Sequence, residues 1–236
     1  WQRYLNWLGG LFTGDLGVSY NFDMPVAKLL SGCIVPTLTL ALMALVLIVL
    51  FSIPLGLFAA RHEGGPVDKV LTVLNQIFMS IPNFVIGIGL VFLFGLVLRI
   101  FSPGAYVKPQ DNLFGYLWYM LFPALAVALP KSAMTVKMLR SSILSELKSD
   151  YVRTAYSKGN SRASALKRHV LRNAMIPIVT AIGMQFANVM TGSALAETVF
   201  SWPGIGSLVV QSINKRDTPM VTGSIILCCV LMALIN

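Results

Sequence analysis

The sequence predicts an all-α membrane protein with five apolar helices that cross a bilayer. Of its 236 residues, 56% are hydrophobic and only 11% are charged, whereas soluble domains carry about 25% charged residues. The charge is also unevenly placed. The stretch from Lys131 to Arg172 holds ten of the 18 Lys and Arg but two of the nine Asp and Glu, which is +8 of the net +9. A basic cluster beside apolar runs indicates a cytoplasmic loop rather than a nucleic-acid surface.

Five apolar runs give the predicted spans, since a helix of about 20 apolar residues crosses the hydrocarbon core of a bilayer. They are Ile34–Ala60, Val70–Leu98, Leu121–Leu139, Met175–Ala196 and a last run from Pro219 to the end of the chain. The second run contains the break SIPNF. Prolines within the first and third runs predict kinked helices. The kinks either surround a translocation pathway or only help the helices to pack.

The loops between these runs predict the orientation. ARHEGGPVDK (60–69) and the strongly basic 140–172 stretch are separated by two crossings, so they share one side, which the positive-inside rule makes cytoplasmic. Segments 1–30, 99–120 and 197–218 then face outward, and one more helix is expected before Trp1. The predicted domains are an extracytoplasmic segment, 1–30, and a transmembrane domain, 31–236, whose cytoplasmic loop covers about 141–173.

The basic loop itself predicts two short helices. Leu144, Leu147, Tyr151 and Ala155 recur at helical spacing, which gives one apolar stripe. Gly159 is then expected to end the first helix in a left-handed conformation, and Asn160 or Ser161 to cap the second. The alternative from physics alone is a solvated basic loop that contacts lipid headgroups.

Other residue types point away from enzymatic chemistry. The three cysteines lie in or beside apolar runs and predict small buried hydrophobes, and both histidines, His62 and His169, fall on the cytoplasmic side. No metal site and no catalytic residues are therefore predicted. The chain also contains no G-x-x-x-x-G-K-[ST] phosphate loop, so it does not itself bind and hydrolyse ATP.

The stretch DYVRTAYSKGNSRASALKRHVLRNAMIP (150–177) resembles the cytoplasmic EAA loop of binding-protein-dependent ABC importer permeases. Ala155, Gly159 and the ending Ile176-Pro177 match that pattern, whereas Arg153 and Thr154 depart from its first two letters. The stretches GDLGVSY, PVAKLLSGCIVPTLTLAL, SIPNF, AETVFSWPGIG and RDTPMV are similar to the dipeptide, oligopeptide and nickel branch. The resemblance covers essentially the whole chain and implies the type I importer permease fold.

The resemblance further implies that a coupling helix at about 149–160 docks on a separate ATPase and transmits its closure to the spans, as a lever of a bistable bundle would. The residues expected to carry this coupling are Asp150, Tyr151, Arg153, Thr154, Ala155, Lys158 and Gly159. The implied partners are two ATP-binding subunits, a second related permease chain, an extracytoplasmic solute-binding protein and membrane lipid, with no nucleic acid. No cofactor is expected on this chain, because ATP and Mg belong to the partner ATPase.

The translocation path or outer gate is expected near AETVFSWPGIG and the polar residues of the spans. The candidates are Asn83, Gln185, Asn188, Glu197, Phe200 and Trp202. Each candidate also has a structural alternative. The segment is then an ordinary turn in which Phe200 and Trp202 anchor the chain at the membrane interface and Glu197 binds the loop backbone. The amides then form hydrogen bonds between helices. Lys131 departs from the family pattern; it either lines the path or extends toward the cytoplasmic face.

Two other classes of protein compete with an importer permease for peptides or nickel and other metal chelates. A secondary transporter or channel driven by an ion gradient predicts intramembrane Asp, Glu or His relays, and the complete spans have essentially none. An intramembrane enzyme would need H-E-x-x-H or paired carboxylates in its spans. The expected location is a bacterial or archaeal cytoplasmic membrane.

Overall fold

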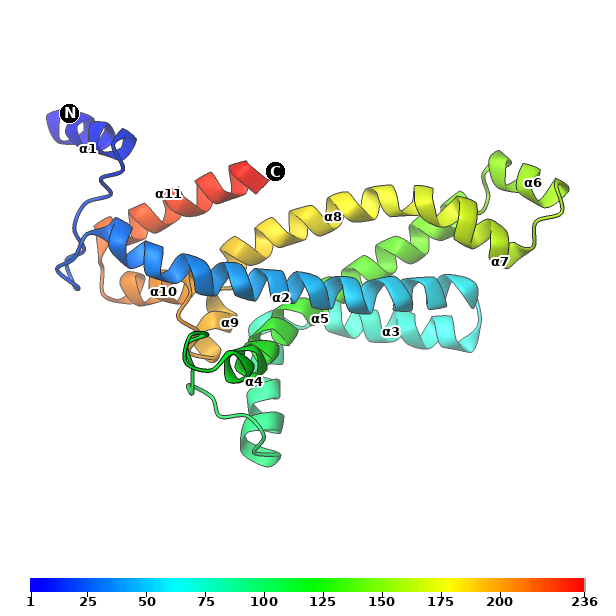
Figure 1. Ribbon diagram of the computed structural model, residues 1–236, viewed down its shortest axis with the longest axis horizontal. Helices are drawn as coiled ribbons and strands as arrows, with labels where there is room; N and C mark the ends of the chain where they lie inside the picture. Colours follow the sequence, from blue (N-terminus) through cyan, green and yellow to red (C-terminus); the bar gives the residue numbers. More distant parts are fainter. Residues whose placement is uncertain (236) are drawn as a thin grey trace.

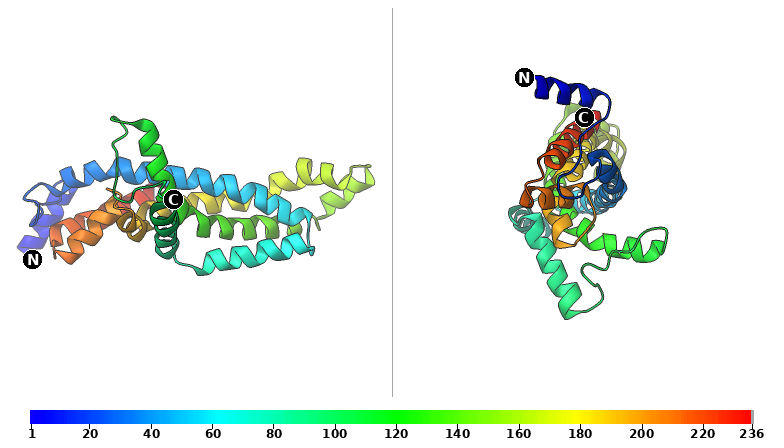
Figure 2. Two further views of the ribbon diagram at one scale, coloured as in Figure 1. Left: turned by 90° about the horizontal axis from the view of Figure 1, so that it is seen from below. Right: turned by 90° about the vertical axis from the view of Figure 1, so that its left-hand side faces the viewer.

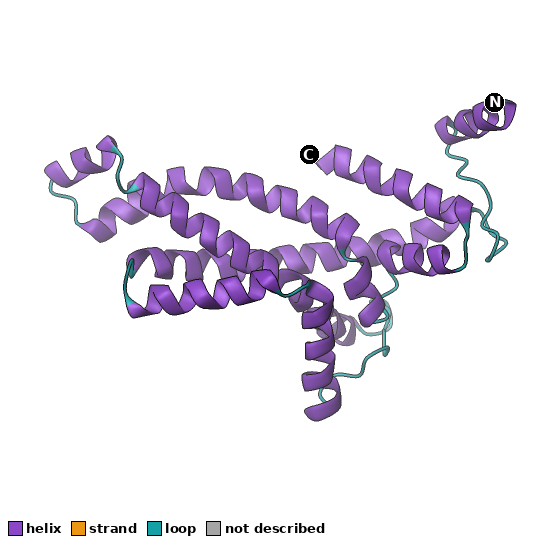
Figure 3. Cartoon of the chain, turned by 180° about the vertical axis from the view of Figure 1, so that it is seen from behind, coloured by secondary structure: helices purple, strands orange, loops and turns teal. Residues whose placement is uncertain are grey.

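The protein is a bundle of long helices joined by turns and loops, seen in a computed structural model that describes residues 1–235 (Figure 3). Four helices run side by side along the long axis (Figures 1 and 2): α2 (Val26–Arg61), α3 (Pro66–Ser80), α5 (Leu113–Glu146) and α8 (Leu171–Gly192). The α2–α3 turn and α6 (Asp150–Ser157) lie at one end, and α1 (Gln2–Phe12) and α10 (Ile205–Asn214) lie at the other. The two basic loops therefore share one end of the bundle, as predicted.

The number of spans agrees with the five predicted if one bent pair of helices counts as a single span. Four helical segments are long and apolar enough to cross a membrane: Val26–Arg61, Leu113–Glu146, Leu166–Thr191 and Thr218–Ile235, the last being α11. A fifth span results if the bent pair Pro66–Ser80 and Asn83–Val97 counts as one. Asn236, the last residue of the predicted transmembrane domain, lies outside the described residues.

The predicted second run, Val70–Leu98, is broken at SIPNF, as expected, and it begins earlier than Val70, at Pro66. It forms α3 and then α4 (Asn83–Leu90), which a π-helical segment, Val91–Val97, extends; the two halves are bent by 99°. The bend falls at the predicted break, because Pro82 has no N–H for an α-helical bond and pushes the residue before it, Ile81, into extended backbone. Figure 1 shows α4 turning away to one side of the bundle.

The helices α2 and α5 are both longer than the apolar runs that predicted them. The helix α2 begins at Val26, well before Ile34, so the expected boundary at residue 30 falls inside it. Val26 and Leu30 explain the early start, because both are buried in a small apolar cluster with Ile205 and Met220. At its other end, α2 packs closely on α5: a Cβ added to Gly56 would lie 2.8 Å from the Leu139 side chain.

The predicted stripe from Leu144 to Ala155 is wrong as a single helix. The helix α5 carries Leu144 and ends at Glu146, and α6 starts only at Asp150. The connection bends there because Ser149 has extended backbone. After α6, the chain continues through α7 (Arg162–Ala165) and a π-helical segment, Leu166–Val170, into α8, and later through α9 (Ala194–Val199).

Candidate functional site

The helix α6 ends as its sequence predicts. Gly159 follows its C-cap with a φ of +84°, a left-handed conformation that favours glycine. The N–H of Gly159 donates to the Tyr156 carbonyl at 2.9 Å, and the N–H of Asn160 donates to the Ala155 carbonyl at 3.1 Å. These two bonds form a Schellman motif, which satisfies the last carbonyls of the helix. Ser161 is the cap of the next helix: its Oγ accepts from the N–H of Ser164 at 3.3 Å.

One face of α6 packs on its own chain and the other faces outward. Val152 is fully buried and Ala155 is 7% exposed, so Ala155, expected on the docking surface, instead seats the helix against the bundle. Six of the seven expected coupling residues are exposed: Asp150, Tyr151, Arg153, Thr154, Lys158 and Gly159. The exposed face is therefore polar and mixed in charge, and it lies beyond the end of the long helices (Figure 1).

Tyr151 links α6 back to the end of α5. Its hydroxyl donates to Glu146 Oε2 at 2.5 Å. Partial burial and this bond to a carboxylate raise the pKa of Tyr151, because both disfavour a phenolate. The side chain thus stays neutral at physiological pH and braces the turn that leads into α6.

The segment AETVFSWPGIG, predicted to face outward, folds around the carboxylate of Glu197. This side chain is fully buried; Oε1 accepts from the Ser193 hydroxyl at 2.8 Å, and Oε2 accepts from the N–H of Ser207 at 2.9 Å. The N–H of Trp202 donates to the Glu197 carbonyl at 2.8 Å. The carboxylate therefore holds the start of α9 and the start of α10 together. Contact between the cargo and Glu197 stays a prediction.

Phe200 and Trp202 are fully buried rather than exposed at an interface with lipid. Trp202 stacks on Tyr119, with ring centroids 6.1 Å apart, and its indole N–H donates to the Pro36 carbonyl at 3.1 Å. Tyr119 in turn donates to the Phe200 carbonyl. The segment is thus joined to α2 by the bond to the Pro36 carbonyl and to α5 by an aromatic cluster. Phe101, Tyr106, Tyr116 and Phe122 also belong to this cluster.

The three predicted amides lie in different surroundings. Gln185 is 6% exposed and donates to the Thr135 hydroxyl at 2.9 Å, which joins α8 to α5. Asn188 is exposed on α8, and Asn83 is half-buried at the first turn of α4, beside the bend. The structure therefore does not gather the six predicted path residues into one cavity among the described residues.

Sequence reasoning missed two acid-centred contacts. Asp68 binds Arg140 at the end predicted to be cytoplasmic, and Asp217 binds the segment around Ser19 at the end predicted to face outward. The signal for the second was present, because GDLGVSY and RDTPMV stood out as separate motifs. The spacing of the two motifs along the sequence did not predict that they contact each other.

Asp217 fastens the outward N-terminal segment to the turn before α11. It is fully buried and accepts from the Ser19 hydroxyl at 2.5 Å and from the N–H groups of Tyr20, Asn21 and Met220, each at 3.3 Å. Burial raises the pKa of Asp217, but these donors together outweigh it and hold the pKa below its ordinary 3.8. The bonds therefore stabilise the fold above that value, and the stabilisation is lost as the pH falls through the lowered pKa.

Asp217→Ala is expected to free this segment, because the donors around the lost carboxylate would stay buried without an acceptor, at about 1–3 kcal/mol. Limited proteolysis from the outward side should then cut near Ser19 at neutral pH in the variant. The wild type should become sensitive there only in acid. Asp111→Ala, at an exposed position of another outward loop, is the matched control; equal protection of both variants would contradict the role of Asp217.

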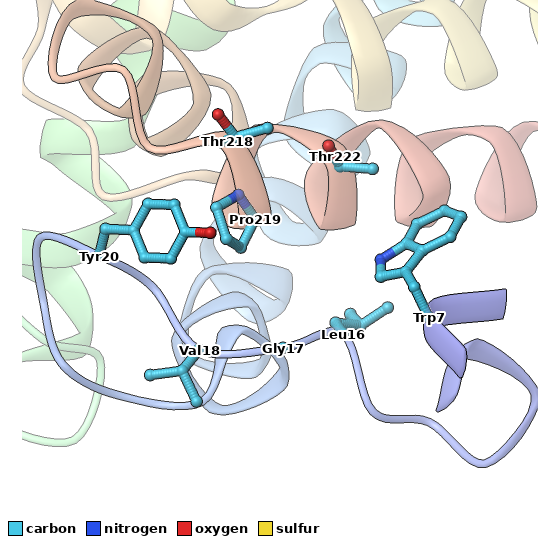
Figure 4. Close-up of a pocket in the computed structure, with 8 residues that line it drawn as sticks. All are labelled: Trp7, Leu16, Gly17, Val18, Tyr20, Thr218, Pro219 and Thr222. Carbon is cyan, nitrogen blue, oxygen red and sulfur yellow. The ribbon is translucent and has the colours of Figure 1, made fainter. Parts of the chain in front are cut away.

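Beside this contact lies an open cleft of about 510 Å³. Figure 4 shows Trp7 of α1 facing the first turns of α11 across it, with Leu16, Val18 and Tyr20 on the connecting segment. The segment that Asp217 fastens therefore forms one wall of this cleft.

Long apolar helices around a buried core, with a short polar helix beyond one end, are the arrangement expected of a multi-pass membrane protein. The chain belongs to the family of binding-protein-dependent transport system inner membrane components, whose model matches residues 52–236. The protein is therefore a cytoplasmic-membrane permease of a binding-protein-dependent ABC importer, and it works with an ATPase and a binding protein.

Curated relatives match nearly the whole chain. The "Probable peptide ABC transporter permease protein y4tP" of Sinorhizobium fredii is 35% identical over 99% of this chain and 75% of its own length. The oligopeptide transport system permease protein AppB of Bacillus subtilis is 32% identical with the same coverage. The dipeptide transport system permease protein DppB of Escherichia coli is 32% identical over 100% of this chain and 76% of its own length.

Solved structures confirm the predicted fold. A chain of the MetNI methionine ABC transporter, in inward-facing conformations, superposes with a TM-score of 0.68 at 16% identity, covering 88% of this chain and 91% of that one. A chain of an amino acid ABC transporter gives 0.65 at 19% identity, with 89% and 90% covered. The type I importer permease fold is therefore shared even where the sequences have diverged.

Proposed function

We propose that this permease moves peptides, and that α6 is the helix through which a partner ATPase drives it. Relatives that are 32–35% identical are named as peptide, oligopeptide and dipeptide permeases. Peptides are therefore better supported as the cargo than the nickel or metal chelates of the same branch. The three named relatives match along nearly the full chain, so the support covers the spans as well as the cytoplasmic loop.

The position of α6 carries the coupling role. It stands beyond the bundle, at the end that holds both basic loops, and its outer face presents Asp150, Tyr151, Arg153, Thr154 and Lys158. Its inner face is anchored by Val152 and Ala155, and Gly159 sets the direction in which the chain returns. A short helix that is rigidly seated on one face and free on the other can transmit a displacement from a partner.

The remaining partners follow from the same scheme. Two ATP-binding subunits dock on this chain and on a second, related permease chain, and a solute-binding protein delivers cargo at the outward end. ATP and Mg are used by the ATP-binding subunits, and this chain takes no cofactor and performs no catalysis. The exposed Asn188 and the half-buried Asn83 are the proposed cargo-facing amides. Glu197, Phe200 and Trp202 then shape the gate from within.

Transport by the assembled complex tests this function. The chain, purified with its ATP-binding subunits, the second permease and the binding protein, is placed in liposomes and offered labelled dipeptides and oligopeptides. Uptake is expected to require ATP, the binding protein and all membrane subunits. Uptake by this chain alone, driven by an ion gradient without ATP, would instead support the secondary-transporter alternative. Uptake of metal chelates but not peptides would contradict the proposed cargo.

A further inference from the structure

The helix α6 is fastened to the cytoplasmic ends of α5 and α8. Its Val152 lies in one buried apolar cluster with residues of both helices: Leu139, Ile143, Ala174 and Ile178. The Ser142 hydroxyl of α5 also donates to the Ala174 carbonyl of α8 at 3.0 Å. A displacement of α6 therefore carries these two helix ends with it, because packed interiors move as units rather than deform freely.

Asp68 ties α3 to the same end of α5. Arg140 of α5 donates from Nε to Asp68 Oδ1 at 2.5 Å and from Nη2 to Asp68 Oδ2 at 2.6 Å. The N–H of Gly64, in the α2–α3 turn, donates to Oδ2 at 2.9 Å. Asp68 is 3% exposed. A buried carboxylate with a bidentate guanidinium partner is strongly directional. Removing Arg140 leaves the buried Asp68 carboxylate without its partner, whereas the Arg140 side chain is 30% exposed.

The rest of α3 packs against α5 and α2 through side chains that stay partly exposed. Asp68 is the one buried residue of α3, all of whose residues the structure describes. Along its length, an apolar groove of about 160 Å³ opens where α3 meets α2 and α5; its lining includes Phe78 of α3, Phe51 of α2 and Val136 of α5. The ion pair is therefore the buried, directional attachment between α3 and α5, whereas the apolar contacts along the rest of α3 are non-directional.

The far end of α3 leads to the segment AETVFSWPGIG (196–206), which is called the gate segment below after its proposed role. Beyond the bend at Pro82, Gly87 of α4 lies so close to Phe200 that an added Cβ would be 3.1 Å from its ring. Phe200 follows α9 in the segment built around Glu197. A shift of α3 at the cytoplasmic end thus reaches that segment through α4.

Building on the coupling role proposed for α6, we propose that Asp68 and Arg140 are a positioning pair that makes α3 and α4 follow the coupling helix. The pair converts a push on α6 and α5 into movement of the bent α3–α4 span against the gate segment. Without it, α5 moves while α3 slides along the groove, and ATP is hydrolysed without opening the path.

The test measures uptake per ATP hydrolysed in the complete transporter in liposomes. Asp68→Asn keeps the size of the side chain and an acceptor for Gly64 but removes the charge. Stimulation of ATP hydrolysis by loaded binding protein is expected to stay within about twofold, while uptake per ATP falls about tenfold, a typical size for a coupling between sites. Arg140→Gln should lower uptake per ATP by a similar factor. The double variant should be no worse than either single variant, because each single substitution already removes the same interaction.

Lys137→Gln removes a charge from an exposed position one turn earlier in α5, and this matched control should leave uptake per ATP unchanged. An unchanged ratio in Asp68→Asn would overturn the positioning role. If that variant does not assemble, Arg140→Lys, which keeps the charge but not the bidentate fork, is expected to lower the ratio several-fold. A normal ratio there, or failure of both variants to assemble, would assign the pair to folding and overturn the proposal.

The same assay separates this inference from the coupling role of α6. If Gly159→Val transports normally, the role of α6 is refuted whatever Asp68→Asn does. If Gly159→Val loses uptake while Asp68→Asn keeps the wild-type ratio, α6 couples but the ion pair does not transmit its motion.

Discussion

Gly159→Val is expected to abolish most ATP-driven uptake while the spans stay folded. Gly159 has a φ of +84°, and a β-branched residue there is strained by about 1–2 kcal/mol. An added Cβ would meet nothing within 4 Å, so the effect comes from the backbone alone. The chain would leave the left-handed conformation, the Schellman bonds to Ala155 and Tyr156 would be lost, and α6 would change its direction. Uptake should fall by about tenfold or more.

Gly159→Asn is the matched control, because asparagine adopts the left-handed conformation more readily than other side chains. It should retain most of the uptake, although its side chain is larger than a methyl group. The measurement is uptake by the reconstituted complex, with co-purification of the ATP-binding subunits as a second readout. Equal loss in both variants would mean that the space around Gly159, and not its backbone conformation, matters to the ATPase.

Local signals in the sequence predicted much of the cytoplasmic end. Gly159 and Ser161 mark a helix end and a helix start because a left-handed φ and a side-chain cap depend on few neighbouring residues. The apolar runs predicted the spans for a similar reason, since burial in lipid requires length and composition only. The helix ends were less predictable: α2 begins at Val26 because of contacts with Ile205 and Met220, far away in the chain.

Contacts between distant segments were not predictable from the pattern. Asp68 and Arg140 are 72 residues apart, and Asp217 and Ser19 are 198 apart, so no periodicity connects them. Pro82 signals a break in a helix, but the 99° angle depends on how α4 packs against Phe200 and its neighbours. Phe200 and Trp202 resembled interfacial aromatics, yet the carbonyls and rings that bury them come from α2 and α5.

These distant contacts make the gate segment part of the core rather than a loop on its surface. Glu197 holds α9 to α10, Trp202 binds α2, and Phe200 lies between α4 and α5. A segment that touches so many spans cannot shift independently of them. Movement of the spans should therefore reposition it as a unit, and substitutions within it should affect folding as well as transport.

Gly206→Ala is expected to prevent the folded transporter from accumulating. A Cβ on Gly206 would lie 2.5 Å from the Cα and 2.9 Å from the backbone N of Ala194. Backbone atoms cannot rotate away as a side chain can, so α9 and α10 would have to separate, at a cost of about 3 kcal/mol or more. The amount of complex in the membrane and its thermal unfolding temperature should both fall sharply.

Gly204→Ala meets a different obstacle and provides the internal comparison. Its Cβ would lie 2.4 Å from Glu197 Oε2, the end of a side chain, so Glu197→Ala should partly restore Gly204→Ala but not Gly206→Ala. Gly183→Ala, where nothing lies within 4 Å of the added Cβ, should fold at least as well as the wild type, because alanine favours a helix over glycine by about 0.5–1 kcal/mol. Normal accumulation of Gly206→Ala would contradict the close approach of α9 and α10. Equal rescue of both variants by Glu197→Ala would place the obstacle at the carboxylate alone, and the gate segment would then be held by Glu197 rather than by contact between the two helices.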